Sequence, residues 1–229
     1  MRAEQMLFTQ GFGTRHECRG LIDQGRVALQ DKILRSSQDE VDPLGKWFTV
    51  DNNRWPYVQK AVIVLNKPLG YECSMRPTEH PSVLGLLPAP LRYRGVQPVG
   101  RLDADTTGLL LLTDDGALNH RLTHPKHHIE KTYRVTLKHA VQGDFAQRLL
   151  EGVLLKDEKA SIRAEQCTIL SDNQIEVTVT SGKYHQVKRM IAAAGNRVIA
   201  LHRESMGGLA LPTGLEPGAW TWVFHFPWN

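Results

Sequence analysis

The residues with the strongest chemical character lie in one short segment near the middle of the chain. The sequence GRLDADTTG at 100–108 places an arginine and two carboxylates beside a turn, and four leucines follow directly. Carboxylates so close to an apolar run need either partners or a function, because burying an unpaired charge is costly. On the simplest interpretation, Asp103 and Asp105 cap a turn through side-chain hydrogen bonds to the backbone.

A first functional interpretation of this segment is a phosphatase-like site. Residues 103–107 have the form DxDx[TV], in which one carboxylate attacks a phosphoryl group and Mg²⁺ offsets its charge. That motif normally ends a hydrophobic strand near the start of a parallel-sheet domain. Here the sequence GVQPVGRL precedes it, and its position is nearly mid-chain. The flanking sequence therefore disfavours this interpretation.

A second interpretation takes several segments together. GRLDADTTGLLLLTDDG at 100–116 is followed by KTYRV at 131–135 and by SGKYHQVKRMIAAAGNRVIALHRESMGGL at 181–209. In this order the segments resemble the RsuA-like family of pseudouridine synthases, and within it the branch that acts on small-subunit (16S) ribosomal RNA. LNKPLGYECS at 65–74 and HPSVLGLL at 80–87 extend the resemblance over most of the later part of the chain. A single GRLD would carry little information, whereas the ordered set is specific.

The resemblance implies an RNA isomerase and gives the matching residues their roles. Pseudouridine formation breaks the bond between C1′ and N1 of uridine, turns the base and joins C1′ to C5, so no cofactor is required. Asp103 corresponds to the essential carboxylate, which either adds to the nucleotide or removes a sugar proton. Tyr133 corresponds to the aromatic residue that stacks on the flipped uracil. Lys188 corresponds to the basic partner of the carboxylate, and Arg101 to the residue that fills the space left by the base.

By the same resemblance, the substrate-binding residues also include Lys131, His185 and Arg189. Pattern alone gives simpler interpretations of two of the central residues. Tyr133 is also typical of an aromatic in an alternating strand, and Lys188 of a solvated helix. The ordered segments, rather than any one residue, therefore carry the prediction.

Several histidines lie between two of these segments, at positions 120, 124, 127 and 128. Their spacing of three to four residues is compatible with a metal site. No cysteine or suitably spaced acid completes such a site, and the surrounding residues are basic. Contact with phosphate or exposure to solvent is therefore favoured, and we expect no metal.

The N-terminal residues predict a short helix followed by a strand. Thr14-Arg-His-Glu17 has the form of a capping box, apolar residues at helical spacing follow, and Gly25 ends the helix. A strand is expected at 26–29. The polar segment DNNRWPY at 51–57 is typical of a linker. We therefore expect a small domain at 1–57 and a larger one at 58–229.

In the family that this sequence resembles, a module of this kind is an S4 RNA-binding domain that precedes the catalytic domain. The resemblance makes residues 1–57 S4-like, with Arg15, Arg19 and Arg26 expected to contact RNA phosphates. The pattern departs from that of the family at residues 3–5 and 29–31.

The larger domain mixes strands and helices without regular βαβ alternation, which indicates the α+β class. Residues 175–179 alternate between apolar and polar, as in a half-buried antiparallel strand. Residues 187–194 have apolar side chains at helical spacing, and Gly195 follows them. With the resemblance, these elements predict a mixed or antiparallel sheet that forms a pseudouridine synthase domain.

Composition is that of an ordinary globular protein. The 229 residues are 41% hydrophobic and 23% charged, with a net charge of +4, and basic residues cluster at 120–139 and 182–206. Apolar runs are far too short to cross a bilayer, and the N-terminus lacks the features of a signal peptide. Three widely spaced cysteines give no disulfide framework. We expect a cytoplasmic protein, a monomer that does not associate with membranes.

Ribosomal RNA is the expected partner. The segment YHQVKRM at 184–190 resembles the corresponding segment of enzymes that act on small-subunit RNA. This resemblance points to 16S rRNA, free or within a partly assembled subunit. A rival hypothesis from another class is an RNA-binding ribosome-assembly factor that kept the fold but lost catalysis. The intact set of Asp103, Tyr133 and Lys188 favours the enzyme, because a binding protein has no chemical need of it.

Overall fold

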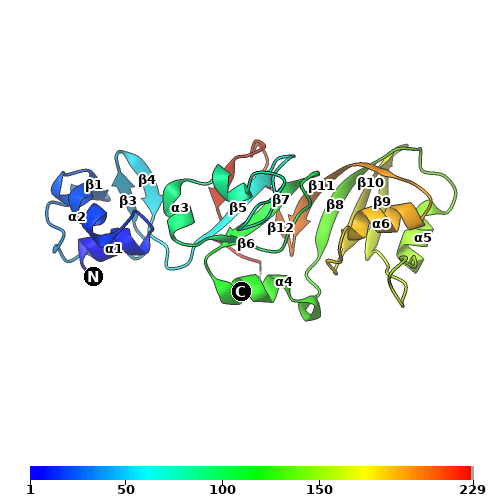
Figure 1. The fold of residues 1–229 in the computed structure, drawn as a ribbon, viewed down its shortest axis with the longest axis horizontal. Coiled ribbons are helices and arrows are strands. Elements are labelled where there is room, and N and C mark those ends of the chain that lie inside the picture. Colours follow the sequence, from blue (N-terminus) through cyan, green and yellow to red (C-terminus); the bar gives the residue numbers. More distant parts are fainter. Residues whose placement is uncertain (228–229) are drawn as a thin grey trace. The chain divides into compact units, whose positions relative to one another are not determined.

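The computed structural model describes residues 1–227, and the chain divides into two compact units (Figure 1). The first unit comprises Met1–Ala61, Leu87–Gln97 and Thr113–Asp115; the second comprises Val62–Leu86, Pro98–Leu112 and the residues from Gly116 onward. The domain boundary predicted after residue 57 stays a prediction, since two later stretches of the chain also belong to the first unit. No helix within the described residues is both long and apolar enough to cross a membrane.

The first unit combines three short helices with a four-stranded sheet of order β2-β1-β3-β4. Its elements are α1 (Ala3–Thr9), α2 (Arg15–Asp23), β1 (Val27–Leu29), β2 (Lys32–Ile33), β3 (Trp47–Val50), β4 (Asn53–Pro56) and α3 (Ala89–Tyr93). The predicted capping box begins α2: Glu17 N–H donates to Thr14 Oγ1 at 3.2 Å, and Thr14 N–H donates to Glu17 Oε2 at 2.6 Å. Gly25, at φ +70°, follows the end of this helix as predicted.

The prediction of a linker at 51–57 is wrong. Residues 53–56 form β4, which pairs antiparallel with β3, and Asp51 and Asn52 make the connecting turn at φ +51° and +63°. Positive φ at two successive residues is what a two-residue β-hairpin turn of type I′ requires. Trp55 then packs edge-on against Phe12, with ring centroids 5.3 Å apart. The polar pair therefore marks a hairpin inside the unit, and its aromatic residue contributes to the core.

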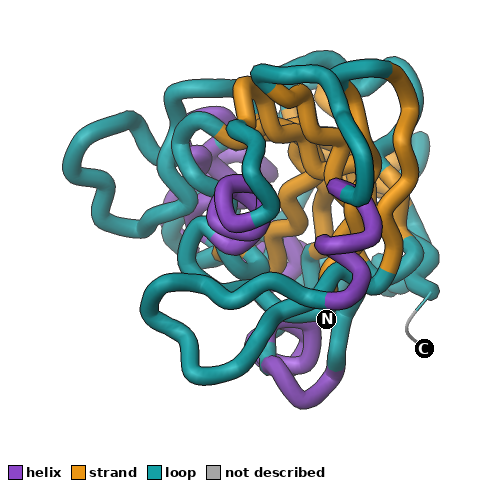
Figure 2. The backbone as a smooth tube through the Cα atoms, turned by 90° about the vertical axis from the view of Figure 1, so that its right-hand side faces the viewer, coloured by secondary structure: helices purple, strands orange, loops and turns teal. Residues whose placement is uncertain are grey.

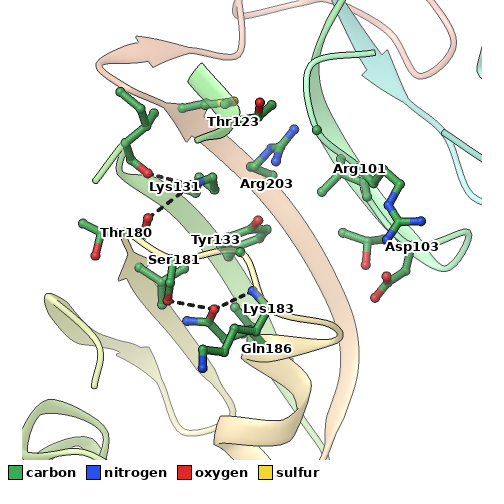
Figure 3. Close-up of a pocket in the computed structure, with 18 of the residues that line it drawn as sticks. Arg101, Asp103, Thr123, Lys131, Tyr133, Thr180, Ser181, Lys183, Gln186 and Arg203 are labelled. Atoms are coloured by element: carbon green, nitrogen blue, oxygen red, sulfur yellow. Dashed lines mark hydrogen bonds between the residues drawn. The ribbon is translucent and has the colours of Figure 1, made fainter. Parts of the chain in front are cut away.

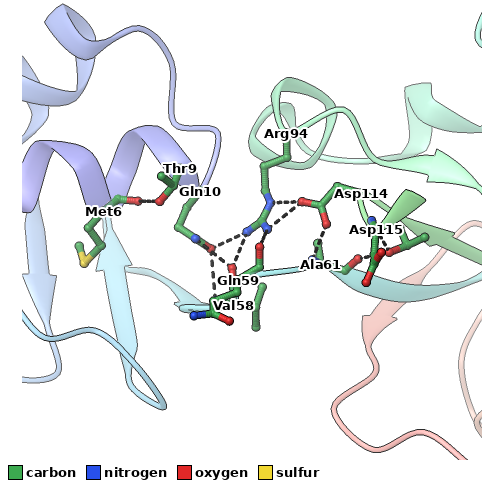
Figure 4. Close-up of polar contacts among 10 residues, drawn as sticks. Met6, Thr9, Gln10, Val58, Gln59, Ala61, Arg94, Asp114 and Asp115 are labelled. Atoms are coloured by element: carbon green, nitrogen blue, oxygen red, sulfur yellow. Dashed lines mark hydrogen bonds and ion pairs between the residues drawn. The ribbon is translucent and has the colours of Figure 1, made fainter. Parts of the chain in front are cut away.

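A buried ion pair joins separate stretches of the chain within the first unit (Figure 4). Arg94 Nε donates to Asp114 Oδ2 at 2.8 Å, and the two side chains are 4% and 13% exposed. The same guanidinium donates to Gln10 Oε1 at 2.6 Å and to the carbonyls of Val58 and Gln59, each at 3.1 Å. A buried charge is stable only with such partners. This arginine therefore joins the residue after α1 and the chain at 58–59 to Asp114, the residue that follows β7.

The second unit is built on a nine-stranded sheet. Its strands are β5 (Val62–Lys67), β6 (Gln97–Pro98), β7 (Thr106–Thr113), β8 (Lys131–Leu137), β9 (Gln166–Ser171), β10 (Gln174–Val179), β11 (Val198–Met206), β12 (Leu209–Ala210) and β13 (Trp220–Trp222). Its helices are α4 (Gly116–Thr123), α5 (Phe145–Glu151) and α6 (Gln186–Ala193), with short 3₁₀ helices η1 (Val83–Leu86) and η2 (Pro125–His127). Figure 2 distinguishes these strands from the helices and loops that connect them.

The topology of this sheet confirms the predicted α+β class. The strand order is β13-β5-β7-β11-β8-β10-β9; β11 runs parallel to β7 and antiparallel to β8. The predicted alternating strand is β10, in which Ile175, Val177 and Val179 are buried. The predicted final helix is α6, which contacts β11 and ends just before Gly195 at φ +93°. The sheet thus brings β7, β8 and β11 side by side, and these strands carry the candidate site.

Candidate active site

The acidic segment forms a loop that leads directly into the core of the second unit. Asp103 C=O accepts a hydrogen bond from Thr106 N–H at 3.0 Å, which closes the turn before β7. The four leucines of β7, residues 109–112, are completely buried. Burial of each such side chain contributes about 1.5–3 kcal/mol, so this strand anchors the loop firmly. The two carboxylates therefore extend from a fixed support.

Lys188 lies between the two carboxylates. Its Nζ donates to Asp103 Oδ2 at 2.8 Å and to Asp105 Oδ1 at 2.6 Å. Partial burial alone would lower the pKa of Lys188, but the hydrogen bonds and charges of both aspartates raise it above its usual value. For Asp105, burial acts to raise the pKa, and Lys188 outweighs it, so the pKa is lowered. The predicted pairing of Lys188 with Asp103 is present, and the same ammonium also binds Asp105.

His185 approaches Asp103 from the start of α6. Its Nε2 lies 3.4 Å from Asp103 Oδ1, and its ring stacks on Tyr184 with centroids 3.8 Å apart. The backbone of His185 is left-handed, at φ +48°, which is uncommon for a residue other than glycine. Strained backbone of this kind is often found at functional sites. The carboxylate of Asp103 therefore faces two basic side chains from one helix start.

A cavity of about 310 Å³ in the second unit contains these groups (Figure 3). Its charged and aromatic lining residues include Arg101, Asp103, Lys131, Tyr133, His185, Lys188 and Arg203. In Figure 3, Lys131, Tyr133 and Arg203 lie near one another, and Arg101 and Asp103 lie on a separate segment to their right. Ligand cavities typically have volumes of about 300–1,000 Å³, so this one is suited to a single nucleoside-sized group.

Tyr133 and Lys131 reach the cavity from β8. They are two residues apart, so their side chains lie on the same face of the strand, and Tyr133 is only 8% exposed. Lys131 Nζ donates to the carbonyl of Ile129 at 2.7 Å. Burial, and secondarily the charge of Arg203, lowers the pKa of Lys131 to about 8. The tyrosine and a readily titrated lysine thus share one wall.

The remaining predicted substrate-binding residues differ in position. Arg101 is exposed, lines the cavity and has no side-chain partner among residues 1–227, which leaves its guanidinium available to a ligand. Arg189 is not among the lining residues. Its guanidinium instead donates to Tyr184 C=O at 3.3 Å and pairs with Asp157 at 3.4 Å. Sequence adjacency to Lys188 does not bring it into the cavity, because successive helical residues point about 100° apart.

The three arginines predicted to bind RNA belong to the first unit and have partners there. Arg15 Nη1 donates to Gln5 Oε1 at 2.7 Å, and Arg19 pairs with the buried carboxylate of Glu4. Arg26 forms a bidentate pair with Asp51, with both distances 2.6 Å. A phosphate would therefore have to compete with a carboxylate at Arg19 and at Arg26. The partner of Arg15 is the uncharged amide of Gln5, so no carboxylate neutralises its positive charge.

The histidine-rich segment borders the cavity through His124, and the rings of His120 and His127 lie against that of His124 at 5.0 and 5.9 Å. Within the described part of the chain, no group of three or more His, Cys, Asp or Glu side chains is arranged to hold a metal ion.

Lys67 is a residue of the site that the sequence reasoning missed. It is completely buried at the end of β5, and its Nζ donates to the carbonyls of Pro68, Ala104 and Thr106 at 3.0, 3.3 and 2.9 Å. Burial lowers its pKa, while the charges of Asp105 and Asp103 act in the opposite direction. Lys67 thus ties the loop carrying both aspartates to β5. A lysine at the end of a strand that begins with four apolar residues was the available signal.

The sequence and the fold of this chain are similar to those of known proteins. Residues 61–193 match the RNA pseudouridylate synthase family. Ribosomal small subunit pseudouridine synthase A of Escherichia coli (strain K12) is 47% identical over 200 residues, covering 86% of this chain and 85% of that protein. The protein of the same name from Yersinia pestis is 43% identical over 193 residues, covering 84% of this chain and 82% of its own.

A solved structure, described as a crystal structure of pseudouridylate synthase, is 35% identical to this chain. It superposes with a TM-score of 0.69 and covers 97% of this chain and 96% of its own. The predicted resemblance is therefore confirmed over the segments on which it was based: the chain belongs to the RNA pseudouridylate synthase family.

Proposed function

We propose that the protein converts a uridine of small-subunit (16S) ribosomal RNA to pseudouridine, acting in the cytoplasm. The observation that carries the proposal is the 2.8 Å pair of Asp103 and Lys188 in the same cavity as Tyr133. The names of the relatives from Escherichia coli and Yersinia pestis support the small ribosomal subunit as the source of the substrate.

In the proposed mechanism, Asp103 acts at the sugar. In one route its carboxylate bonds to C1′ as the C1′–N1 bond breaks, and it is displaced when C5 attacks C1′. In the other route it removes the C2′ proton to give a glycal and later returns that proton. Both routes need the ionised carboxylate, which Lys188 stabilises. Because the overall reaction is an isomerisation without redox change, side chains suffice.

The base is positioned by the rest of the cavity. Tyr133 stacks on the flipped uracil, and its hydroxyl assists removal of the C5 proton after the new bond forms. Arg101, exposed and unpaired within the described residues, fills the gap that the base leaves in the RNA stack. We further propose that residues 1–57 are an S4-like RNA-binding domain, with Arg15 the most available of its arginines.

The test is to incubate the purified protein with 16S RNA, 23S RNA, tRNA and partly assembled small subunits, and to map pseudouridine in each. A single modified position in 16S RNA, free or partly assembled, is the expected result. Modification confined to 23S RNA or tRNA would contradict the proposal that 16S RNA is the substrate. Tight binding to RNA with no modification of any of them would favour the assembly-factor hypothesis instead.

Tyr133→Phe is expected to bind RNA as tightly as wild type but to react about 100-fold more slowly, since the ring is kept and the proton-transferring hydroxyl is lost. Release of tritium from RNA containing 5-tritiated uridine reports the affected step. Tyr93→Phe, a change at a tyrosine that is 75% exposed on α3, is the matched control and should react normally. Equal tritium release by the two variants would contradict a role for the Tyr133 hydroxyl.

Substrate affinity is expected to fall as the pH rises from 7 to 9. Because the pKa of Lys131 is lowered to about 8, its amine is charged below that pH and neutral above it. The loss of one cation from the cavity should raise KM about 3- to 10-fold, a change of roughly 1 kcal/mol. Lys131→Arg stays charged throughout and should give a flatter profile. Identical profiles for the two proteins would show that Lys131 does not contribute.

A further inference from the structure

Arg203 is a buried cation that the mechanism above does not use. It is 2% exposed and is the bulkiest fully buried side chain in the described part of the chain. Its Nε donates to Leu109 C=O at 2.7 Å. Its Nη2 is also buried but has no hydrogen-bond partner among residues 1–227. Buried donors in native proteins almost always have partners, so an unpartnered one requires an explanation.

The backbone holds Arg203 in a defined place. Arg203 on β11 pairs with Tyr133 on β8 and with Gly108 on β7. Gly108 has φ +102°, and a Cβ there would lie 2.3 Å from the carbonyl oxygen of Arg203, so only glycine permits this close approach. The register of β11 against β8 shifts directly after Arg203. Such irregularities often redirect a side chain beside an active site.

Arg203 is part of the wall of the cavity that Tyr133 also lines (Figure 3). Thr106, another lining residue, has a second buried polar atom, Oγ1, without a partner among residues 1–227. Lys131 adds another cation, and the charge of Arg203 contributes to its lowered pKa. Among the described lining residues, Asp103 is the only carboxylate, and Lys188 and His185 already face it. This wall is therefore positively charged, and two of its buried polar atoms have no hydrogen-bond partner among residues 1–227.

Resting on the proposed function, we propose that Arg203 Nη2 donates a hydrogen bond to an exocyclic oxygen of the flipped uracil and stabilises the uracil as a leaving group. When the C1′–N1 bond breaks, its electron pair stays on the base, and the negative charge spreads over N1, O2 and O4. A fixed donor in a water-poor cavity stabilises such a charge most effectively. C5 then attacks C1′, the C5 proton leaves, and N1 takes up a proton, so no other reagent is consumed.

The test compares two substrates of different leaving-group ability. RNA containing 5-fluorouridine at the target position releases a less basic uracil, which needs less stabilisation by the protein. Arg203→Met is expected to slow single-turnover loss of uridine about 100-fold, with RNA affinity nearly unchanged. With 5-fluorouridine as the substrate, the same substitution should slow the reaction only about tenfold or less. Arg203→Lys keeps a positive charge, so its rate should lie between those of Arg203→Met and wild type.

Leu137→Ala is the matched control for damage to the sheet. Leu137 is buried on β8 but does not line the cavity, so its loss should affect both substrates alike. Thermal melting checks each protein, and Arg203→Lys carries the comparison if Arg203→Met does not fold. Equal fold losses on uridine and 5-fluorouridine would overturn this inference alone. A wild-type protein inactive on every RNA would overturn the proposed function and this inference with it.

Discussion

Asp103→Asn is expected to lower the rate of uridine isomerisation by at least about 10⁴-fold while RNA affinity stays within about threefold of wild type. The amide keeps the shape of the side chain and can still contact Lys188, but it neither attacks C1′ nor accepts a sugar proton. The measurement is single-turnover conversion of the target uridine, followed by chromatography of the digested nucleosides, alongside equilibrium binding of the same RNA.

Asp105→Asn is the matched control for this experiment. Asp105 also accepts a hydrogen bond from Lys188, at 2.6 Å, but its side chain is 72% exposed and does not line the cavity. Its amide variant should therefore lose about tenfold or less in rate. An Asp103→Asn protein that reacts within about tenfold of wild type, or an equal loss in both variants, would remove Asp103 from the reacting centre.

Lys188→Met is expected to slow the reaction by about 10³-fold, again with little change in RNA affinity. Without the ammonium, the two aspartates share one site with no cation between them. Asp103 then loses the hydrogen bond and the opposite charge that hold its carboxylate in place for either proposed route.

The control is Lys188→Arg, which keeps a cation between the carboxylates and should retain a rate within about tenfold of wild type. The readout is the single-turnover rate of wild type and both variants, alongside equilibrium binding of the same RNA. If Lys188→Met instead binds RNA weakly but converts bound RNA at the normal rate, Lys188 contacts phosphate rather than Asp103.

Local signals in the sequence predicted several elements well. The capping box at Thr14–Glu17 begins α2, and the glycines at 25 and 195 follow α2 and α6 as expected. These signals succeed because a cap or a positive φ is determined by neighbouring residues. The linker predicted at 51–57 failed, since the same polar residues suit both a linker and a hairpin turn. Which of the two forms depends on whether Trp55 finds an apolar partner, and Phe12 lies more than forty residues earlier in the chain.

The same distinction applies to the site. Asp103 and Lys188 are eighty-five positions apart, and they were paired through the family resemblance rather than from spacing. In the sequence, Arg203 is distinguished only as one member of the basic cluster at 182–206. Its burial follows from the parallel pairing of β11 with β7, a long-range contact with no local signature. Arg189 shows the converse. The family resemblance predicted that it binds substrate, but its side chain does not line the cavity and instead contacts Tyr184 and Asp157.

The ion pair of Arg94 and Asp114 bears on how this architecture can be recombined during evolution or engineering. The compact unit at the N-terminus is discontinuous in sequence, because residues 87–97 and 113–115 complete it. A chimera that exchanges only the first 57 residues would remove Gln10 from the Arg94 guanidinium, and a cut between 94 and 114 would separate the ion pair itself. Loss of one partner of a buried pair costs about 3–5 kcal/mol, a large part of the stability of a typical domain. Successful exchange of this unit should therefore require the donor's counterparts of Gln10, Arg94 and Asp114 to be transplanted together.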